Sequence, residues 1–226
     1  MFTTNCINTL RKTLVLVIGL FISFTAFGYF FGDEPKFRVY QASNTFTAIE
    51  SKEISKTEVR NRLKQKALQA KQYVNDRGYD GTYCFLLDMR LPSGKNRFFV
   101  YNLEDDSVEM AGLVSHGRGS QNGSDELVFS NTPNSLCTSL GKYKLGKSYQ
   151  GMFGLSYKLY GLDKTNSKAF ERNVVLHSYT GVPKQEVYPA TISVSEGCPV
   201  IAPDFLTQVK MYMDASDAPI LLWIYY

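Results

Sequence analysis

The sequence predicts a mainly β domain with an N-terminal helix and small helical insertions. Three observations lead to this class. The chain has 226 residues and contains 15 tyrosines and 15 phenylalanines, which suit the half-buried surfaces of β-sheets. From about Tyr79 onward, short apolar runs alternate with turn signals. One long segment, residues 55–78, instead repeats its apolar residues at helical spacing.

The composition argues against two classes of protein. With 44% hydrophobic and 20% charged residues, the chain is globular and not disordered. Its net charge of +4 is mild, and the basic residues are dispersed without a long stripe. The sequence therefore predicts no binding to nucleic acid.

Residues 13–32 contain no charged side chain. A run of this length, at about 1.5 Å per residue, can cross the roughly 30 Å hydrocarbon core of a bilayer. Basic residues precede the run and acidic residues follow it, which places the N-terminus in the cytoplasm and the rest of the chain outside. These flanking residues are Arg11, Lys12, Asp33 and Glu34.

Two interpretations of residues 1–35 remain open. The segment is either an uncleaved signal anchor or a secretory signal that is cut after a small-x-small site such as residues 26–28. The apolar run is longer than a usual signal core of about 7–15 residues, which favours the anchor. On both interpretations the protein contacts the membrane only through this segment.

Residues 36–78 are expected to form a polar tether followed by an amphipathic helix. Ser55 and Glu58 make a capping box at its start, and Gly78 is a plausible end. The apolar face, which we expect to pack on the main domain, consists of Val59, Leu63, Ala67, Ala70 and Val74.

Residues 79–226 are predicted to form the main domain. Residues 92–95 separate two apolar runs and indicate a hairpin, whereas glycine-rich loops are expected at 116–124 and between 141 and 161. Residues 203–214 read as a short helix. The candidate strands are 82–91, 97–103, 107–115, the end of 170–177 and 218–226.

Three of the four cysteines, Cys84, Cys137 and Cys198, follow the apolar segment and are exported if it inserts. An odd number in an oxidising compartment leaves at least one thiol unpaired within the chain. Cys84 lies in an apolar run and reads as core. Cys137 lies in a polar loop, where it is either exposed or bonded to Cys84.

Cys198 follows Gly197 in the stretch SVSEGCPVI, and His177 ends an apolar run upstream. An imidazole can take the proton of a thiol and return it to a leaving amine, so this pair fits a nucleophile and its base. The rival is a zinc site made of His116, His177 and Cys198, but no paired ligand spacing supports a metal, and no cofactor is expected.

The pair His177-Ser178 followed by Ser195-Glu196-Gly197-Cys198 resembles the His…[Ser/Thr]-x-Gly-Cys signature of murein L,D-transpeptidase catalytic domains. Segments 149–178 and 114–120 resemble the branch of that family often found as exported proteins of Gram-negative bacteria. The resemblance covers about residues 81–201.

The resemblance implies a β-sandwich fold with the cysteine in a cleft under a flap. Its enzymes act on peptidoglycan stem peptides, a donor tetrapeptide and an acceptor stem, outside the cytoplasm. They release D-alanine through a cysteine thioester and form 3→3 cross-links. Resolution by water would make the same site an L,D-carboxypeptidase. The resemblance places the domain in the periplasm or on the extracytoplasmic face of the inner membrane.

The resemblance also assigns roles to residues. Cys198 is the nucleophile, His177 the general base, and the carbonyl of Ser178 orients His177. The amides of Gly197 and Cys198 form the oxyanion hole, and Ser195 shapes the turn and contacts the substrate.

This chain departs from the family pattern at two positions. Glu196 stands where many members have histidine, and Val200 stands where many have arginine or asparagine. The substrate carboxylate then needs another partner, for which Arg118 and Arg172 are candidates, although Arg172 reads equally well as a solvated charge before the strand. His116 either lines the cleft or caps a turn.

Tyr149 and Gly151 are candidates to line the cleft, although strand packing is the simpler explanation for the aromatic residues of this stretch. Two rival functions remain beside the enzyme. One is a murein-binding module without catalysis, and the other is a general cysteine peptidase that uses the same dyad.

Overall fold

The computed structural model describes residues 55–123 and 126–226. The predicted signal segment, residues 1–35, and the tether lie outside the described residues, so their assignment stays a prediction. Within the described part of the chain, no helix has both the length and the apolar character that crossing a bilayer requires.

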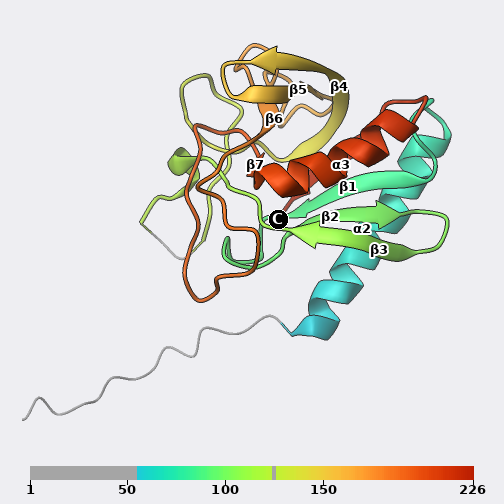
Figure 1. The fold of residues 1–226 in the computed structure, drawn as a ribbon, viewed down its shortest axis with the longest axis horizontal. Coiled ribbons are helices and arrows are strands. Elements are labelled where there is room, and N and C mark those ends of the chain that lie inside the picture. Colours follow the sequence, from blue (N-terminus) through green and yellow to red (C-terminus); the bar gives the residue numbers. More distant parts are fainter. Residues whose placement is uncertain (1–54, 124–125) are drawn as a thin grey trace, which may run out of the picture. The chain divides into compact units, whose positions relative to one another are not determined.

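Eight strands form one sheet in the order β3-β2-β1-β8-β4-β5-β6-β7 (Figure 1). Strands β1 and β8 pair in parallel, as do β6 and β7, and all other neighbours are antiparallel. The strands are β1 Tyr83–Asp88, β2 Phe98–Asn102, β3 Ser107–Gly112, β4 Gly141–Gly151, β5 Gly154–Gly161, β6 Val175–Ser178, β7 Val200–Ile201 and β8 Leu221–Tyr225. The mainly β class is confirmed.

The two halves of this sheet share one core, which gives the fold its sandwich-like character. Phe85 and Val100 from the β1–β3 half belong to the same buried cluster as Leu159 and Leu176 from the β4–β7 half. In Figure 1 the long, curved β4 connects the two halves. Burial of such side chains stabilises the fold by about 1.5–3 kcal/mol each.

Two helices cover opposite faces of the β1–β3 half (Figure 1). Helix α2, Lys56–Asn75, packs on a cluster that includes Leu86, whereas α3, Pro203–Ala215, packs on the cluster that includes Phe85. Phe85 and Leu86 are adjacent on β1 and point to opposite faces, so the two helices lie on opposite faces of the sheet. The predicted helices, including the packing of α2, are confirmed, and the short 3₁₀ helix η1 is Arg118–Ser120.

The start of α2 follows the capping signal. The side chain of Ser55 accepts a hydrogen bond from the N–H of Glu58 at 3.1 Å, which satisfies one of the free donors of the first turn. The apolar stripe is buried as expected, and the helix ends at Asn75, three residues before Gly78.

The expectation of glycine-rich loops between residues 141 and 161 is wrong. This stretch forms β4 and β5, the two longest strands, which make an antiparallel hairpin. Four of its glycines stand at strand ends, and Gly146 lies where the register shifts between Leu145 and Ser148. The alternation of buried residues such as Tyr143 and Leu145 is a strand signal that the glycines concealed.

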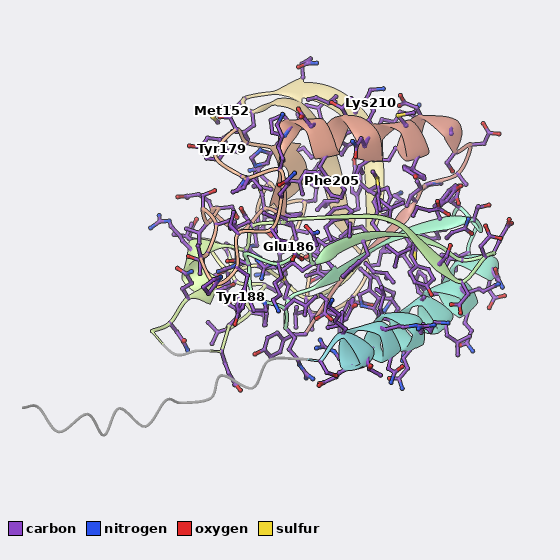
Figure 2. The ribbon with its side chains drawn as sticks, turned by 60° about the horizontal axis from the view of Figure 1, so that its bottom comes forward. Met152, Tyr179, Glu186, Tyr188, Phe205 and Lys210 are labelled. Carbon is purple, nitrogen blue, oxygen red and sulfur yellow. The ribbon has the colours of Figure 1, made fainter. Side chains whose placement is uncertain are left out.

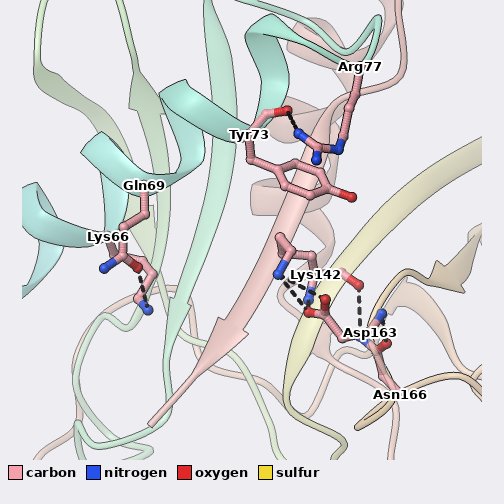
Figure 3. Close-up of polar contacts among 7 residues, drawn as sticks. All are labelled: Lys66, Gln69, Tyr73, Arg77, Lys142, Asp163 and Asn166. Carbon is pink, nitrogen blue, oxygen red and sulfur yellow. Dashed lines mark hydrogen bonds and ion pairs between the residues drawn. The ribbon is translucent and has the colours of Figure 1, made fainter.

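A polar network fixes the connection between β5 and β6 to β4 (Figure 3). The carboxylate of Asp163 accepts hydrogen bonds from the backbone N–H (2.7 Å) and the Nζ (2.9 Å) of Lys142. Asn166 donates to the carbonyl of Lys142 at 2.8 Å and accepts from the N–H of Asp163 at 2.9 Å. This connection leads directly into Arg172 and β6, so the network helps to position both.

Cys84, Cys137 and Cys198 are all free thiols. Cys84 is fully buried, as the apolar run predicted. Cys137 is also buried, with 7% of its surface exposed, so it is neither the exposed thiol nor the partner of Cys84 that the sequence suggested. The carbonyl of Ser135 accepts a hydrogen bond from its thiol.

Candidate functional site

The parallel pairing of β6 and β7 brings His177 and Cys198 to one edge of the sheet. His177 pairs with Val200, so Cys198, two residues before Val200, lies beside Val175, two residues before His177. Val175 and His177, two residues apart on β6, share a face. Cys198 lies beside Val175 in the bend before β7, and no hydrogen bond joins its side chain to that of His177 in the described structure.

Two backbone groups contact the thiol of Cys198. The N–H of Val175 donates to its sulfur at 3.5 Å, and the thiol in turn donates to the carbonyl of Asn173 at 3.8 Å. Asn173 has a φ of 56°, a left-handed conformation that asparagine tolerates better than most residues. The turn before β6 thus positions both groups that contact the sulfur.

His177 is oriented by its own strand and covered by an aromatic ring. Its Nδ1 lies 3.1 Å from the carbonyl of Ser178, which assigns the proton to Nδ1 and leaves Nε2 as the basic nitrogen. Phe153 stacks on the imidazole with ring centroids 4.3 Å apart. Burial lowers the pKa of His177, and the bond to Ser178 opposes that shift. The imidazole is therefore neutral near pH 7.

Ser195 braces the turn that carries Cys198. Its hydroxyl donates to the carbonyl of Cys198 at 2.6 Å and accepts from the N–H of Gly197 at 3.1 Å. The N–H of Gly197 is thus engaged in this conformation, which leaves the Cys198 N–H as the remaining donor of the two expected for an oxyanion. Gly197 has a φ of 117°, a backbone conformation that other residues rarely adopt.

Arg172 connects this turn to the segment of residues 130–139. Its guanidinium donates to the carbonyls of Cys137 at 2.6 Å and Ser130 at 2.9 Å, and also to the hydroxyl of Ser139. A Cβ placed on Gly197 would lie 3.3 Å from the same guanidinium and 2.9 Å from the carbonyl of Cys137. Arg172 is therefore a structural neighbour of the cysteine turn and not a solvated charge.

Electrostatics keep the Cys198 thiol protonated in the free protein. Burial is the main effect and raises the pKa of Cys198, and the carboxylate of Glu196 adds to that rise. The N–H of Val175 opposes it, followed by the positive charges of Arg172 and Lys158. With a neutral His177 beside it, the resting pair is thiol and imidazole, not thiolate and imidazolium.

Arg118 and Glu196 form an exposed ion pair at the rim of the cysteine turn. Arg118 Nε lies 3.0 Å from Glu196 Oε1, with 56% and 70% of the side chains exposed. The backbone N–H of Arg118 also donates to the carbonyl of Ser195 at 2.7 Å. Both charges are accessible to a ligand, and such exposed pairs are worth little to stability.

Tyr149 and Gly151 lie in the β4–β5 hairpin on the side of His177. Tyr149 pairs with Ser156, which pairs with His177, so the three residues form one row across three strands. Gly151 stands at the end of the hairpin, where Met152 and Phe153 form the turn. Figure 2 shows Met152 and Tyr179 at the outer surface on the hairpin side of the view.

His116 is placed elsewhere. Its imidazole is buried, with 3% of its surface exposed, and Arg97 Nη2 lies 2.8 Å from its Nδ1. Its carbonyl accepts a hydrogen bond from the N–H of Ser195, so the backbone of His116 adjoins the cysteine turn while its imidazole is bonded to Arg97. Among residues 55–123 and 126–226, no three His, Cys, Asp or Glu side chains gather closely enough to hold a metal ion.

Sequence reasoning missed the role of two groups in this site. Phe153 was one of several aromatic residues in its stretch, and its position at a turn between Gly151 and Gly154 was the available signal. The carbonyl of Cys137 had no signal at all, because its approach to Gly197 depends on tertiary packing.

The comparisons with known proteins concern the domain as a whole. Residues 55–225 match the L,D-transpeptidase catalytic domain. A comparison with curated proteins gave no match.

Among solved structures, an L,D-transpeptidase from Xylanimonas cellulosilytica is 15% identical with a TM-score of 0.37, over 68% of each chain. An L,D-transpeptidase from Mycobacterium smegmatis is 15% identical with a TM-score of 0.38, over 64% of this chain and 59% of that one. The helical cell shape determining protein Pgp2 from Campylobacter jejuni is 12% identical with a TM-score of 0.41, over 71% of this chain and 55% of that one.

These structural similarities are low, and the chain spans between about half and two thirds of the structures it matches. The assignment rests instead on the family match, which covers most of the chain, residues 55–225. The protein therefore belongs to the family of L,D-transpeptidase catalytic domains.

Proposed function

We propose that this protein is a cysteine-dependent murein L,D-transpeptidase that forms 3→3 cross-links through a thioester on Cys198. The observation that carries the proposal is the parallel register of β6 and β7. His177 pairs there with Val200, two residues after Cys198, the N–H of Val175 donates to the Cys198 sulfur, and the Nδ1 of His177 lies 3.1 Å from the carbonyl of Ser178. A nucleophile, a base and a group that orients the base are what this chemistry requires.

In the proposed acylation, Nε2 of His177 takes the proton of the Cys198 thiol as the sulfur attacks the carbonyl of the third residue of a stem tetrapeptide. The oxyanion is stabilised by the N–H of Cys198, joined by that of Gly197 if Ser195 releases it. The C–N bond to D-alanine breaks, and His177 returns the proton to the leaving amine. A thioester remains on Cys198.

In the second step, an amine of a neighbouring stem gives a proton to His177 and attacks the thioester. The C–S bond breaks, the proton returns to the sulfur, and a 3→3 peptide bond is formed. Water in place of the amine would yield a tripeptide. The exposed charges of Arg118 and Glu196 at the rim, together with Tyr149 and Gly151, are the proposed contacts to the stem peptides.

The proposal places the domain outside the cytoplasm, on the periplasmic side, where murein is found. Its support is the charge pattern around residues 13–32 and not the folded domain. Fractionation of cells that produce the full chain tests this part, and recovery in the cytosol would contradict it.

The catalytic proposal is tested by incubating the full chain with purified disaccharide-tetrapeptide and analysing products by chromatography and mass. We expect a dimer that lacks one D-alanine, and an acyl adduct on the protein. Both should disappear in Cys198→Ala and persist in Cys84→Ala, the same change at the free thiol of β1.

Other outcomes would change the assignment. Tripeptide without dimer would make the enzyme an L,D-carboxypeptidase with the same nucleophile. A folded protein that binds the tetrapeptide without adduct or product would be a binding module. Cleavage of ordinary L-peptides at the same cysteine would make it a general cysteine peptidase.

A further inference from the structure

A cavity away from Cys198 is built around two buried polar side chains. Its volume is about 310 Å³, near the small end of typical ligand sites, and neither Cys198 nor His177 lines it. Arg97 and His116 are among the lining residues, with only 1% and 3% of their surfaces exposed.

Arg97 is a buried cation without a carboxylate among its hydrogen-bond partners. Its guanidinium donates to the carbonyl of Val114 from Nε at 3.0 Å and from Nη2 at 2.8 Å, and to that of Leu91 at 3.1 Å. Burial lowers the pKa of Arg97 to about 9, with an opposing effect of Asp88, so it stays charged at pH 7. Asp88 does not line the cavity, and its Oδ1 is paired with Arg62.

The partner of Arg97 in the cavity wall is a neutral imidazole. Arg97 donates to Nδ1 of His116, so the single proton of the ring lies on Nε2. Burial and the charge of Arg97 together lower the pKa of His116 to about 4. The Nε2 atom has no hydrogen-bond partner among the described residues, although buried donors are almost always satisfied.

The rest of the lining adds donors and no acidic side chain, and the one carboxylate on a lining residue is that at the end of the chain, on Tyr226. Arg90 contributes a second guanidinium, and Gln121 and Thr191 contribute an amide and a hydroxyl. Ser93 accepts the N–H of Ile192 at 3.3 Å, which leaves its own hydroxyl proton to donate. No described residue that lines the cavity is an aspartate or a glutamate. A site with this charge balance suits an anion.

The segment that carries His116 also contacts the turn that carries Cys198. The carbonyl of His116 accepts the N–H of Ser195 at 2.9 Å, and the next residue, Gly117, approaches Gly197 so closely that a Cβ there would lie 2.8 Å from its Cα. Because successive residues of an extended segment point to opposite sides, the imidazole of His116 points away from the cysteine turn.

We propose that this cavity binds a compact carboxylate, whose oxygens accept hydrogen bonds from Nε2 of His116 and from the guanidinium of Arg90, with Arg97 supplying the buried positive charge. A free small carboxylate and the carboxylate of a murein stem peptide share this chemistry. The inference does not depend on catalysis by Cys198.

The test uses the two histidines of the chain. In the full chain labelled with ¹⁵N-histidine, His116 reports on this cavity and His177 on the candidate active site. We expect acetate to shift the Nε2 resonance of His116 saturably while that of His177 stays in place. If the disaccharide-tetrapeptide shifts His116 and acetate does not, murein is the source of the carboxylate.

Two variants with equal charge change sharpen the result. Arg90→Gln should weaken the effective probe at least fivefold, whereas Lys184→Gln, at an exposed residue outside the lining, should leave its affinity unchanged. The proposal is overturned if neither probe shifts His116, if only His177 responds, or if both variants weaken binding equally.

Discussion

The ring of Phe153 lies stacked on the imidazole of His177, with 16° between the two planes. Phe153 belongs to the turn between β4 and β5, whereas His177 lies on β6, so the contact folds the hairpin tip over the candidate base. Half of the Phe153 side chain remains exposed, and Met152 beside it is 90% exposed. The ring therefore covers one face of the imidazole and limits the water that reaches it.

Phe153→Ala should therefore raise the pKa of His177 towards the ordinary value of about 6.5, because burial is the main cause of its lowered pKa. An NMR titration of the imidazole measures the change. Met152→Ala is the matched control, since it shortens an exposed apolar side chain of the same turn. An unchanged midpoint in Phe153→Ala would contradict this account of the stack.

Alkylation of Cys198 should show a thiol whose pKa lies above that of a free cysteine. Because burial raises the pKa of Cys198, the rate with iodoacetamide should rise with pH to a midpoint above the roughly 8.5 of a free thiol. The modified residue is identified by peptide mass, and Cys198→Ala should lack it. A midpoint below that of free cysteine in the same buffer would show that the resting pair is already ionised.

Much of the fold was predictable because its signals are local. The capping residue Ser55 and the stripe of α2 are properties of short segments, and so is the β1–β2 hairpin. The β4–β5 hairpin was missed for a physical reason. Its glycines read as loop residues, yet at strand ends and at a register shift they permit the curvature that connects the two halves of the sheet.

The candidate site was likewise predictable only in part. Residue types and the family resemblance predicted His177 and Cys198 as base and nucleophile, and these roles stay a prediction. The place of His116 was not predictable, because it depends on the packing of Arg97 from a distant segment. The sequence also offered Arg172 as a substrate partner, whereas the structure shows its guanidinium engaged by backbone carbonyls.

Arg172→Gln should affect both stability and the nucleophile. It removes charged hydrogen bonds to the carbonyls of Cys137 and Ser130, so the free energy of unfolding should fall by about 2–4 kcal/mol. Because the charge of Arg172 lowers the pKa of Cys198, the alkylation midpoint should move further up.

Denaturant unfolding and alkylation together check this prediction, with Lys184→Gln as the control at an exposed lysine. A stable Arg172→Gln protein with an unchanged alkylation midpoint would remove Arg172 from the account of the site.

Gly197→Ala should damage the cysteine turn selectively. An added Cβ would lie 2.9 Å from the carbonyl of Cys137 at a φ that alanine disfavours, so we expect a loss of about 1–3 kcal/mol in stability. A displacement of Cys198 by about 1 Å would lower kcat/KM about 100-fold. Gly78→Ala, at a positive φ with open space around it, should cost stability without lowering kcat/KM. Equal kinetic effects of both changes would contradict the prediction.

The buried His116 should make the protein less stable in mild acid. Its pKa is lowered to about 4 in the folded protein, whereas the unfolded chain keeps the ordinary value of about 6.5. Between these values the unfolded chain binds more protons, so the free energy of unfolding falls as the pH falls, by up to about 3 kcal/mol. The charged side chains that line the cavity with the imidazole are Arg90 and Arg97, and Arg97, with a pKa lowered to about 9, stays charged over this range.

Denaturant unfolding between pH 7 and pH 4 measures this slope in the unaltered chain and in His116→Gln, whose side chain does not titrate. Carboxylates titrate in both proteins, so the difference between the two curves isolates the histidine. The His116→Gln variant should lose less stability on acidification, because glutamine binds no proton in either the folded or the unfolded state. Parallel curves would mean that His116 takes up its proton in the folded protein as readily as in the unfolded chain. The buried, neutral imidazole inferred for the cavity of Arg97 and His116 would then be wrong.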